Sequence, residues 1–177
     1  MRRVMVIDET RCVGCEACVL ACKNENRVAE GQYRDWVVQE VHGAFPNITL
    51  SIRSERCNHC QDAPCVTNCP TGASYLRGDG TVQIDRDRCT GCRACIASCP
   101  YGARFVHPEG FVDKCTLCVH RLDRGEQTAC EEVCPTSAIA VGDADNPRSE
   151  VAERLRRGSL YVLQPEAGTR PNVGYVR

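Results

Sequence analysis

The cysteines of this 177-residue chain constrain its fold more than any other feature. All 16 fall into four runs of four. The first and third runs have the spacing C-x2-C-x2-C-x3-C, which is that of bacterial ferredoxins. The second run widens its middle gap to four residues and the fourth widens it to eleven, but both keep the terminal x3-C. The runs are Cys12, Cys15, Cys18 and Cys22; Cys57, Cys60, Cys65 and Cys69; Cys89, Cys92, Cys95 and Cys99; and Cys115, Cys118, Cys130 and Cys134.

This spacing predicts [4Fe-4S] clusters that exchange ligands between runs. Three thiolates of a tight loop reach three irons of one cubane, while backbone N–H groups point at its sulfurs. The fourth cysteine begins a helix that leads away from that cubane, so it reaches a second one and the runs must work in pairs. A proline follows the last cysteine of three runs and fixes the exit from the loop, whereas Cys22 is followed by Lys23.

Two other uses of cysteine fit this pattern less well. Structural zinc also takes Cys-x2-Cys pairs, but zinc ribbons separate two such pairs by a longer gap and do not repeat a terminal x3-Cys-Pro. A disulfide framework is typical of an exported chain, and crowded Cys-x2-Cys-x2-Cys loops suit it badly. The spacing therefore favours iron–sulfur chemistry over both.

Composition excludes several other classes of protein. The hydrophobic fraction of 42 % includes the cysteines, and there are only one tryptophan, five tyrosines and three phenylalanines, so the apolar core is thin. No apolar stretch approaches the ~18 to 20 residues that span a bilayer. The start of the chain turns acidic at Asp8 before a signal-peptide core could form, so we expect that the chain neither inserts nor exports itself. A net charge of −1 offers no basic surface for nucleic acid.

Short β segments follow the cysteine runs. Residues 73–77 and 81–85 flank an Asp-Gly turn and predict a hairpin, and the pattern recurs at residues 103–113. Residues 4–8 and 138–142 are expected to pair, because each would otherwise leave an unpaired edge. We therefore predict an α+β fold of two nested ferredoxin-like modules. An inner two-cluster module (56–110) is inserted in an outer one (1–33 plus 111–145).

The remaining segments are predicted to connect or extend these modules. Residues 34–55 form a bridging β-hairpin, with strands at 34–42 and 47–53. Residues 146–177 contain a short amphipathic helix from Ser149 to Arg157, with Gly158 as its C-cap.

Beyond that helix, the composition favours an extended arm. Residues 160–177 mix apolar side chains with Pro165, Gly168, Pro171 and Gly174. We expect this arm to need another surface to become ordered, supplied by a catalytic or membrane partner.

Several motifs around the cysteines carry a family resemblance. They are Cys12-Val13-Gly14-Cys15-Glu16-Ala17-Cys18, Cys57-Asn58-His59-Cys60 with Ala63-Pro64-Cys65, Lys114-Cys115-Thr116-Leu117-Cys118 with His120-Arg121, and Pro171-Asn172-Val173-Gly174-Tyr175. Over nearly its whole length the chain resembles the four-cluster iron–sulfur subunits of molybdopterin oxidoreductase complexes. It is most similar to the short subunits of polysulfide, thiosulfate and dimethyl sulfoxide reductases.

The resemblance implies a non-catalytic electron-transfer subunit with four [4Fe-4S] clusters. Its expected partners are a molybdopterin catalytic subunit and an integral membrane subunit that reacts with quinone. The alternatives are a polyferredoxin-like subunit of a hydrogenase or soluble formate-oxidising complex, or a structural metal-stabilised module. No catalytic triad, phosphate loop or acid–base pair of carboxylates is visible in the sequence. The chain is expected at a membrane through its partners, on the periplasmic face by co-export or in the cytoplasm.

The resemblance also implies which cysteines share a cluster, with the first run paired to the fourth and the second to the third. We number the four thiol sets from the first run inward. Site I is Cys12, Cys15, Cys18 and Cys134; site II is Cys22, Cys115, Cys118 and Cys130; site III is Cys57, Cys60, Cys65 and Cys99; and site IV is Cys69, Cys89, Cys92 and Cys95. Because Cys92 is present, a cubane rather than a three-iron cluster is expected at site IV.

Residues other than cysteine are predicted to support the clusters. His59 and His120 are expected to hydrogen bond or pack, because every set already has four thiolates. Trp36 is expected in a core or interface. Each cluster adds a charge of about −2. Of the 22 basic residues only Lys23 and Lys114 are lysines, and each adjoins a ligand of site II. Either they are solvent-facing amines that lie there by chance, or they raise the potential of that cluster.

Overall fold

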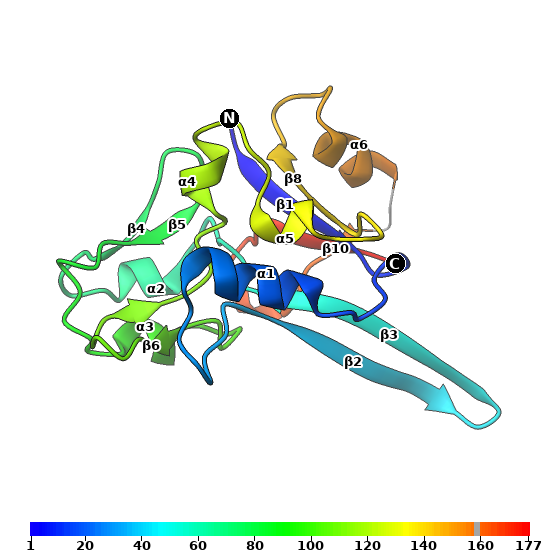
Figure 1. The fold of residues 1–177 in the computed structure, drawn as a ribbon, viewed down its shortest axis with the longest axis horizontal. Coiled ribbons are helices and arrows are strands. Elements are labelled where there is room, and N and C mark those ends of the chain that lie inside the picture. Colours follow the sequence, from blue (N-terminus) through cyan, green and yellow to red (C-terminus); the bar gives the residue numbers. More distant parts are fainter. Residues whose placement is uncertain (158–159) are drawn as a thin grey trace.

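The computed structural model describes residues 1–157 and 160–177. It shows a small mixed α/β fold in which short helices and two-stranded hairpins surround one four-stranded sheet (Figure 1). In chain order the elements are β1 (Arg3–Asp8), α1 (Ala17–Asn26), β2 (Asp35–Ala44), β3 (Asn47–Arg56), α2 (Pro64–Thr67), β4 (Ser74–Leu76), β5 (Val82–Ile84), α3 (Ala94–Ala97), β6 (Phe105–Val106), β7 (Val112–Asp113), α4 (Val119–Leu122), α5 (Ala129–Glu132), β8 (Ile139–Asp143), α6 (Glu150–Arg157), β9 (Leu160–Tyr161), a 3₁₀ turn (Pro165–Ala167) and β10 (Val173–Val176).

The four-stranded sheet has the order β8-β1-β10-β9. β1 pairs antiparallel with β8, so the predicted pairing of the segments at 4–8 and 138–142 is confirmed. β1 is buried on both faces, which is why its sequence is almost continuously apolar. Met5 and Ile7 pack in the core beside α1, whereas Val4 and Val6 pack in a second cluster that contains Val151 of α6.

The C-terminal segment corrects one prediction. β10 pairs in parallel with β1, with Tyr175 opposite Ile7, and the Tyr175 side chain is fully buried. The expectation that a partner's surface must order this arm is wrong, because the chain's own sheet provides that surface. The backbone N–H of Asn172 also donates to the carbonyl of Asn58, 2.9 Å away, which ties the segment to the second cysteine run. The helix is found as predicted, but its C-cap, Gly158, lies outside the described residues.

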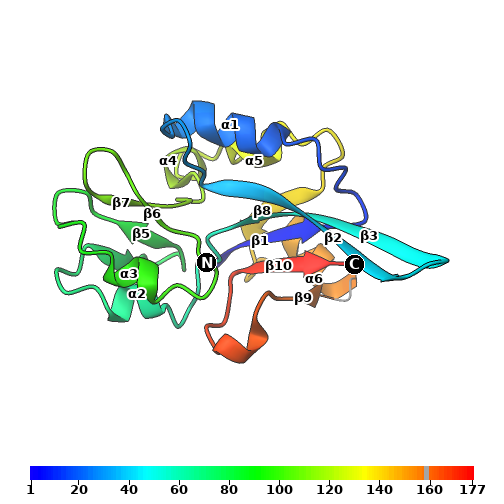
Figure 2. The ribbon, with the colours of Figure 1, turned by 90° about the horizontal axis from the view of Figure 1, so that it is seen from below.

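The three predicted hairpins are confirmed as β2–β3, β4–β5 and β6–β7. Seen from below, β2–β3 crosses the molecule beneath α1 and extends beyond the sheet (Figure 2). Its strands are ten residues each, longer than predicted, and the tip is exposed on both faces, with Phe45 88 % exposed. The described residues contain no helix long and apolar enough to cross a bilayer.

The cysteine runs share one local design. In each run the third cysteine is the second residue of a helix, in α1, α2, α3 and α5. The last three of these helices have four residues and end before the Cys-Pro dipeptide, because proline lacks the N–H that would continue the helix. α1 has Lys23 at that position instead and continues for ten residues, so Cys22 lies inside it.

Candidate metal centres

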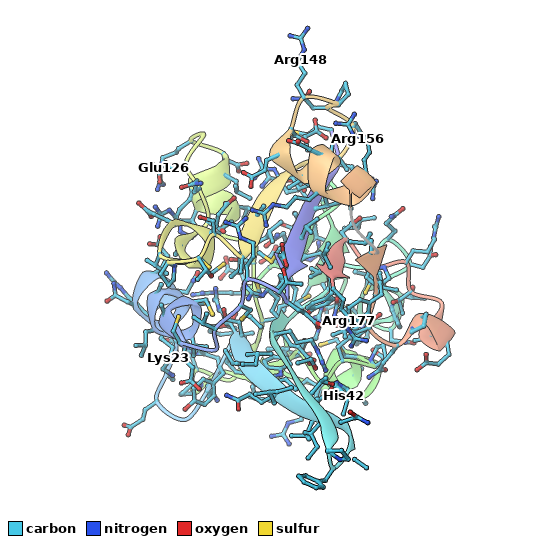
Figure 3. All side chains as sticks on the ribbon, turned by 90° about the vertical axis from the view of Figure 1, so that its right-hand side faces the viewer. Lys23, His42, Glu126, Arg148, Arg156 and Arg177 are labelled. Carbon is cyan, nitrogen blue, oxygen red and sulfur yellow. The ribbon has the colours of Figure 1, made fainter. Side chains whose placement is uncertain are left out.

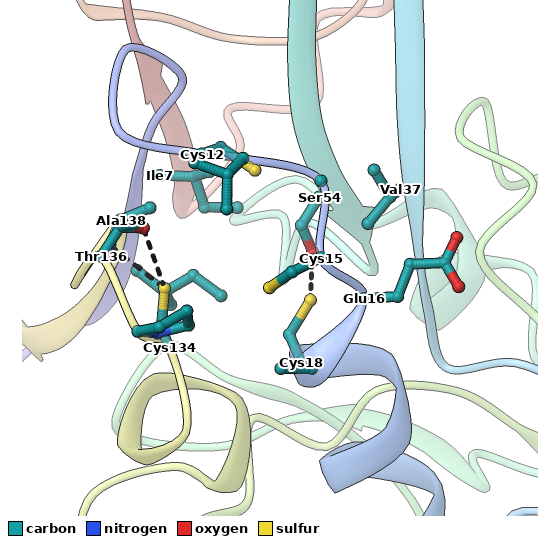
Figure 4. A pocket seen from close by; sticks show the side chains of 15 residues that line it. Ile7, Cys12, Cys15, Glu16, Cys18, Val37, Ser54, Cys134, Thr136 and Ala138 are labelled. Atoms are coloured by element: carbon teal, nitrogen blue, oxygen red, sulfur yellow. Dashed lines mark hydrogen bonds between the residues drawn. The ribbon is translucent and has the colours of Figure 1, made fainter.

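Site I forms an open cavity between α1 and the segment before β8. Its four cysteines, Cys12, Cys15, Cys18 and Cys134, line this cavity together with apolar side chains such as Val37 (Figure 4). Cys12, Cys15 and Cys18 come from one loop and the start of α1, whereas Cys134 comes from the distant fourth run. The structure thus brings together the four thiols that the resemblance assigned to one cluster.

Site II lies deeper, and all four of its cysteines are buried. Burial raises the pKa of the Cys22 thiol, and the neighbouring thiols of Cys115 and Cys130 raise it further. Burial also raises the pKa of Cys118, and the Cys130 thiol acts on it in the same direction. The Cys130 thiol thus acts on both Cys22 and Cys118, and the Cys115 thiol acts on Cys22.

Sites III and IV lie among the helices and hairpins α2, α3, β4–β5 and β6–β7. Burial raises the pKa of Cys60 to about 11, and the thiols of Cys57, Cys65 and Cys99 contribute to the rise. At site IV, burial raises the pKa of Cys95, and the thiols of Cys69 and Cys89 add to it. Cys92, the remaining member, is exposed on the loop before α3.

The four sites follow one another in a row. Cys18 of site I and Cys130 of site II belong to one buried cluster of side chains. Cys115 of site II and Cys57 of site III share a second cluster. Sites III and IV share a third, which contains Cys65 and Cys95. Site I and site IV are the ends of the row, and each has one exposed cysteine, whereas sites II and III have none.

The sulfurs are surrounded by donors that suit a negatively charged cluster. Backbone N–H groups of Ser74 and Ala138 donate to the sulfurs of Cys69 and Cys134 at 3.3 and 3.2 Å, in two matching Cys-Pro-Thr turns. The N–H of Val112 donates to Cys89 at 3.4 Å. Such N–H···S bonds tune iron–sulfur clusters, and all 16 cysteines are free of disulfides.

The loops adopt a backbone conformation that the spacing alone did not reveal. In every run the residue before the second cysteine has a positive φ: Gly14, His59, Gly91 and Leu117. A Cβ at Gly91 would overlap the carbonyl oxygen of Gly110, so this position requires glycine. The sequence itself indicates a positive φ at the two glycines, but nothing in it indicates one at His59 or Leu117.

Two buried arginines, which the sequence analysis did not single out, contact the thiols directly. Nη1 of Arg56 donates to the Cys130 sulfur at 3.0 Å, and Nη2 of Arg104 donates to the Cys65 sulfur at 2.8 Å. Both side chains also have N–H groups without a partner among the described residues: Nε of Arg56, and Nε and Nη1 of Arg104. Unpaired buried guanidinium groups are costly, and the negative charge of a cluster supplies what they lack. The donor set therefore fits iron–sulfur clusters.

The two lysines have different surroundings. Lys114 is only 1 % exposed and donates to the carbonyl oxygens of Val82 and Cys115, so the interpretation as a solvent-facing amine is wrong for it. Nζ of Lys23 instead donates to the carbonyls of Ala29 and Gln32, at 3.1 and 2.7 Å, in the loop after α1. Its charge is thus engaged by that loop.

The histidines and the tryptophan have the supporting roles that were predicted. His59 is buried, and its Nδ1 accepts a hydrogen bond from the Val82 N–H at 3.1 Å. His120 lies on the surface, with Nε2 2.7 Å from a carboxylate oxygen of Glu25. Trp36 packs in the cluster between sites II and III.

Comparison with known proteins identifies the family. Two family models, both described as "4Fe-4S dicluster domain", match residues 48–144 and 11–73. This protein belongs to the 4Fe-4S dicluster family. Its 16 cysteines are consistent with four [4Fe-4S] clusters, so the zinc and disulfide alternatives do not apply.

Curated relatives match over nearly the full chain. A component of the polysulfide reductase of Wolinella succinogenes is 42 % identical over 96 % of this chain and 91 % of its own length. A component of the tetrathionate reductase of Salmonella typhimurium is 42 % identical over 99 % of this chain and 72 % of the relative. The arsenate respiratory reductase iron-sulfur subunit of a Shewanella species is 34 % identical over 100 % and 97 %. The protein is therefore an iron–sulfur electron-transfer subunit of this type and not itself a catalyst.

Proposed function

We propose that the chain conducts electrons along the row of sites I to IV between a molybdopterin catalytic subunit and an integral membrane subunit that reacts with quinone. The observation that supports this most directly is the pattern of exposure. Cys15 of site I and Cys92 of site IV are exposed, whereas every cysteine of site II is buried. Electrons can therefore enter at one end and leave at the other, while the middle of the row is shielded from water.

We further infer that each cluster takes its ligands from two runs, in the sets named as sites I to IV. A [4Fe-4S] cluster supplies one-electron redox chemistry. The chain's own residues would hold it, donate N–H groups to the cysteine sulfurs and keep water away. Ligation needs thiolates, and burial raises the pKa of Cys115 to about 12, so loading of the clusters releases protons.

We also infer that the two pairs of sites correspond to nested modules. The outer module is residues 1–33 plus 111–145, and the inner one is 56–110. The support is that β1 and β8, which lie near the two ends of the outer module, pair directly. The hairpin β6–β7 crosses the boundary at residue 110 and joins the modules. The hairpin at 34–55 and the C-terminal segment 146–177 are the remaining two parts of this proposed domain organisation.

The relatives' names support a reductase complex as the setting. One relative is named as part of a polysulfide reductase, and another as part of a tetrathionate reductase. We propose that this protein reaches the membrane through its partners, on the periplasmic face by co-export or in the cytoplasm.

Purification of the tagged full chain from its native cells tests the proposal. We expect a molybdopterin subunit and a polytopic membrane subunit to copurify, and a quinol analogue to reduce the clusters of the complex. Copurification of a hydrogenase subunit, or of a soluble formate-oxidising enzyme without a membrane subunit, would overturn the proposal in favour of the polyferredoxin alternative.

A further inference from the structure

The three gaps between successive sites each contain one buried cation. Arg56 lies between sites I and II. Its guanidinium donates a hydrogen bond to the Cys130 sulfur of site II. At site I, burial raises the pKa of the Cys18 thiol, and the positive charge of Arg56 lowers it. Arg104 lies between sites III and IV. Burial raises the pKa of Cys65 and of Cys95, and Arg104 lowers both. Each arginine thus faces thiols of two different sites.

Lys114 occupies the middle gap. Its carbonyl partner Cys115 belongs to site II, and the thiols of Cys57 and Cys65 in site III are among the charges that act on its ammonium group. Arg56, Lys114 and Arg104 are 1 %, 1 % and 5 % exposed, so water screens their charges very little. The order along the row is site, cation, site, cation, site, cation, site.

The three cations differ in what balances them. Arg56 has the buried carboxylate of Asp35 at 3.5 Å, which offsets part of its charge. Within residues 1–157 and 160–177, no ion pair joins a carboxylate to Arg104 or Lys114. A buried unit charge without a counter-ion is strongly unfavourable. Clusters on both sides supply the missing negative charge.

We propose that Arg56, Lys114 and Arg104 each raise the reduction potentials of the two clusters that flank them. The effect is strongest at the two gaps that lack a carboxylate. The proposal rests on the ligand sets given under the proposed function. A positive charge between two clusters stabilises the reduced form of both and offsets the repulsion when both are reduced. Loss of one cation therefore changes two potentials and leaves the other two.

Redox titration of the full chain, monitored by paramagnetic resonance, tests this. Each signal is first assigned with single-cluster variants such as Cys134→Ser. We expect Arg104→Gln to lower the reduction potentials of sites III and IV by about 59 mV. For a one-electron couple, this shift lowers the ratio of reduced to oxidised cluster tenfold at a fixed solution potential. Lys114→Gln should lower the potentials of sites II and III. Asp35→Asn should have the opposite effect and raise the potentials of sites I and II, because it removes the negative charge that offsets Arg56.

Two further variants separate charge from packing. Arg104→Lys keeps the charge and should keep both potentials, and Arg148→Gln removes an exposed arginine far along the surface and should move none (Figure 3). If Arg104→Gln loses clusters III and IV while Arg104→Lys keeps them, the charge is again required. Loss of the clusters in both variants, a shift confined to one cluster, or four unchanged potentials would overturn the proposal. None of these measurements needs a partner, so failure of copurification leaves them intact.

Discussion

The two halves of the molecule, each of which we propose to hold two clusters, are stabilised differently. The outer half, which is the four-stranded sheet with α1, α5 and α6, has a buried core of nine residues of which two are cysteines, and a second core with none. The inner half is α2, α3, the hairpin β4–β5 and the β6–β7 hairpin that links it to the outer half, and it has a core of six residues of which three are cysteines. The outer half therefore has hydrophobic stabilisation of its own, whereas we expect the inner half to depend on metal ligation.

Removal of iron should reveal this difference most strongly. After anaerobic chelation of the full chain, we expect amides of β4–β5 and β6–β7 to lose protection from hydrogen exchange, because their strands have only two or three residues. Amides of β1 and β10 should keep more protection. Equal loss in both halves, measured by mass spectrometry, would contradict the comparison.

Loss of single ligands should have unequal consequences. Cys134→Ser should remove the cluster at site I alone, so that iron falls from about 16 to about 12 atoms per chain. Cys99→Ser, the matched change in the inner half, should remove site III and also damage site IV, because the two share a core rich in cysteine. Iron analysis with paramagnetic resonance measures both.

One outcome of the same experiment would disprove the crossed ligation. In Cys134→Ser the missing signal should be that of the cluster held by the first run. If the signal of the Cys115 and Cys118 cluster disappears instead, the ligands of each cluster come from one run.

Truncation of an apolar side chain should matter most in the outer half. Tyr175 is fully buried between β1 and β9, and Tyr175→Ala should cost about 3–5 kcal/mol of stability. Tyr75 on β4 is 42 % exposed, so Tyr75→Ala should cost far less. The temperature at which near-ultraviolet circular dichroism is lost compares the two. Similar shifts would mean that β10 adds little to the outer core.

A pair of glycines sharpens the argument within the inner half. Gly91 and Gly102 both have positive φ, which costs alanine roughly 1–2 kcal/mol at either position. Only Gly91 faces a backbone oxygen that its Cβ would overlap, and Gly102 faces open space. Gly91→Ala should therefore lower the fraction of chains with full iron content, and Gly102→Ala should lower it much less. Equal effects would show that backbone conformation alone decides the outcome.

The smallest effect is expected from Lys23. Because its ammonium is held by the carbonyls of Ala29 and Gln32, Lys23→Gln should leave all four potentials unchanged, in contrast to Lys114→Gln. A shift of the site II potential in the Lys23 variant would restore the interpretation in which both lysines act on that cluster.

The sequence predicted what depends on short distances along the chain. The cysteine spacing, the Asp-Gly turn after Arg77 and the alternating strands beside it all lie within a few residues, and the hairpins were found where they were expected. Pairing of β1 with β8 was predicted because two otherwise unpaired edges were visible. The parallel pairing of β10 with β1 was not, since glycine and proline near Val173 indicated only irregular structure and no local signal names a distant partner.

The buried cations show a second limit of the sequence. Lys114 attracted notice because lysine is rare in this protein, but its burial and its second neighbouring site depend on how segments distant in the sequence pack together. Arg56 and Arg104 stand among many other arginines, and nothing in their local sequence distinguishes them. Charges buried by tertiary packing have no periodicity of their own.

The position of β10 also bears on how the protein is made. β10 follows every other strand in the sequence and lies beside β1, the first. On the ribosome, the contiguous inner segment emerges completely while the N-terminal strand still lacks both of its neighbours. Iron delivery during translation can therefore complete sites III and IV first. Site I can be completed only after Cys134 has emerged, and the four-stranded sheet only after Val173–Val176 has emerged.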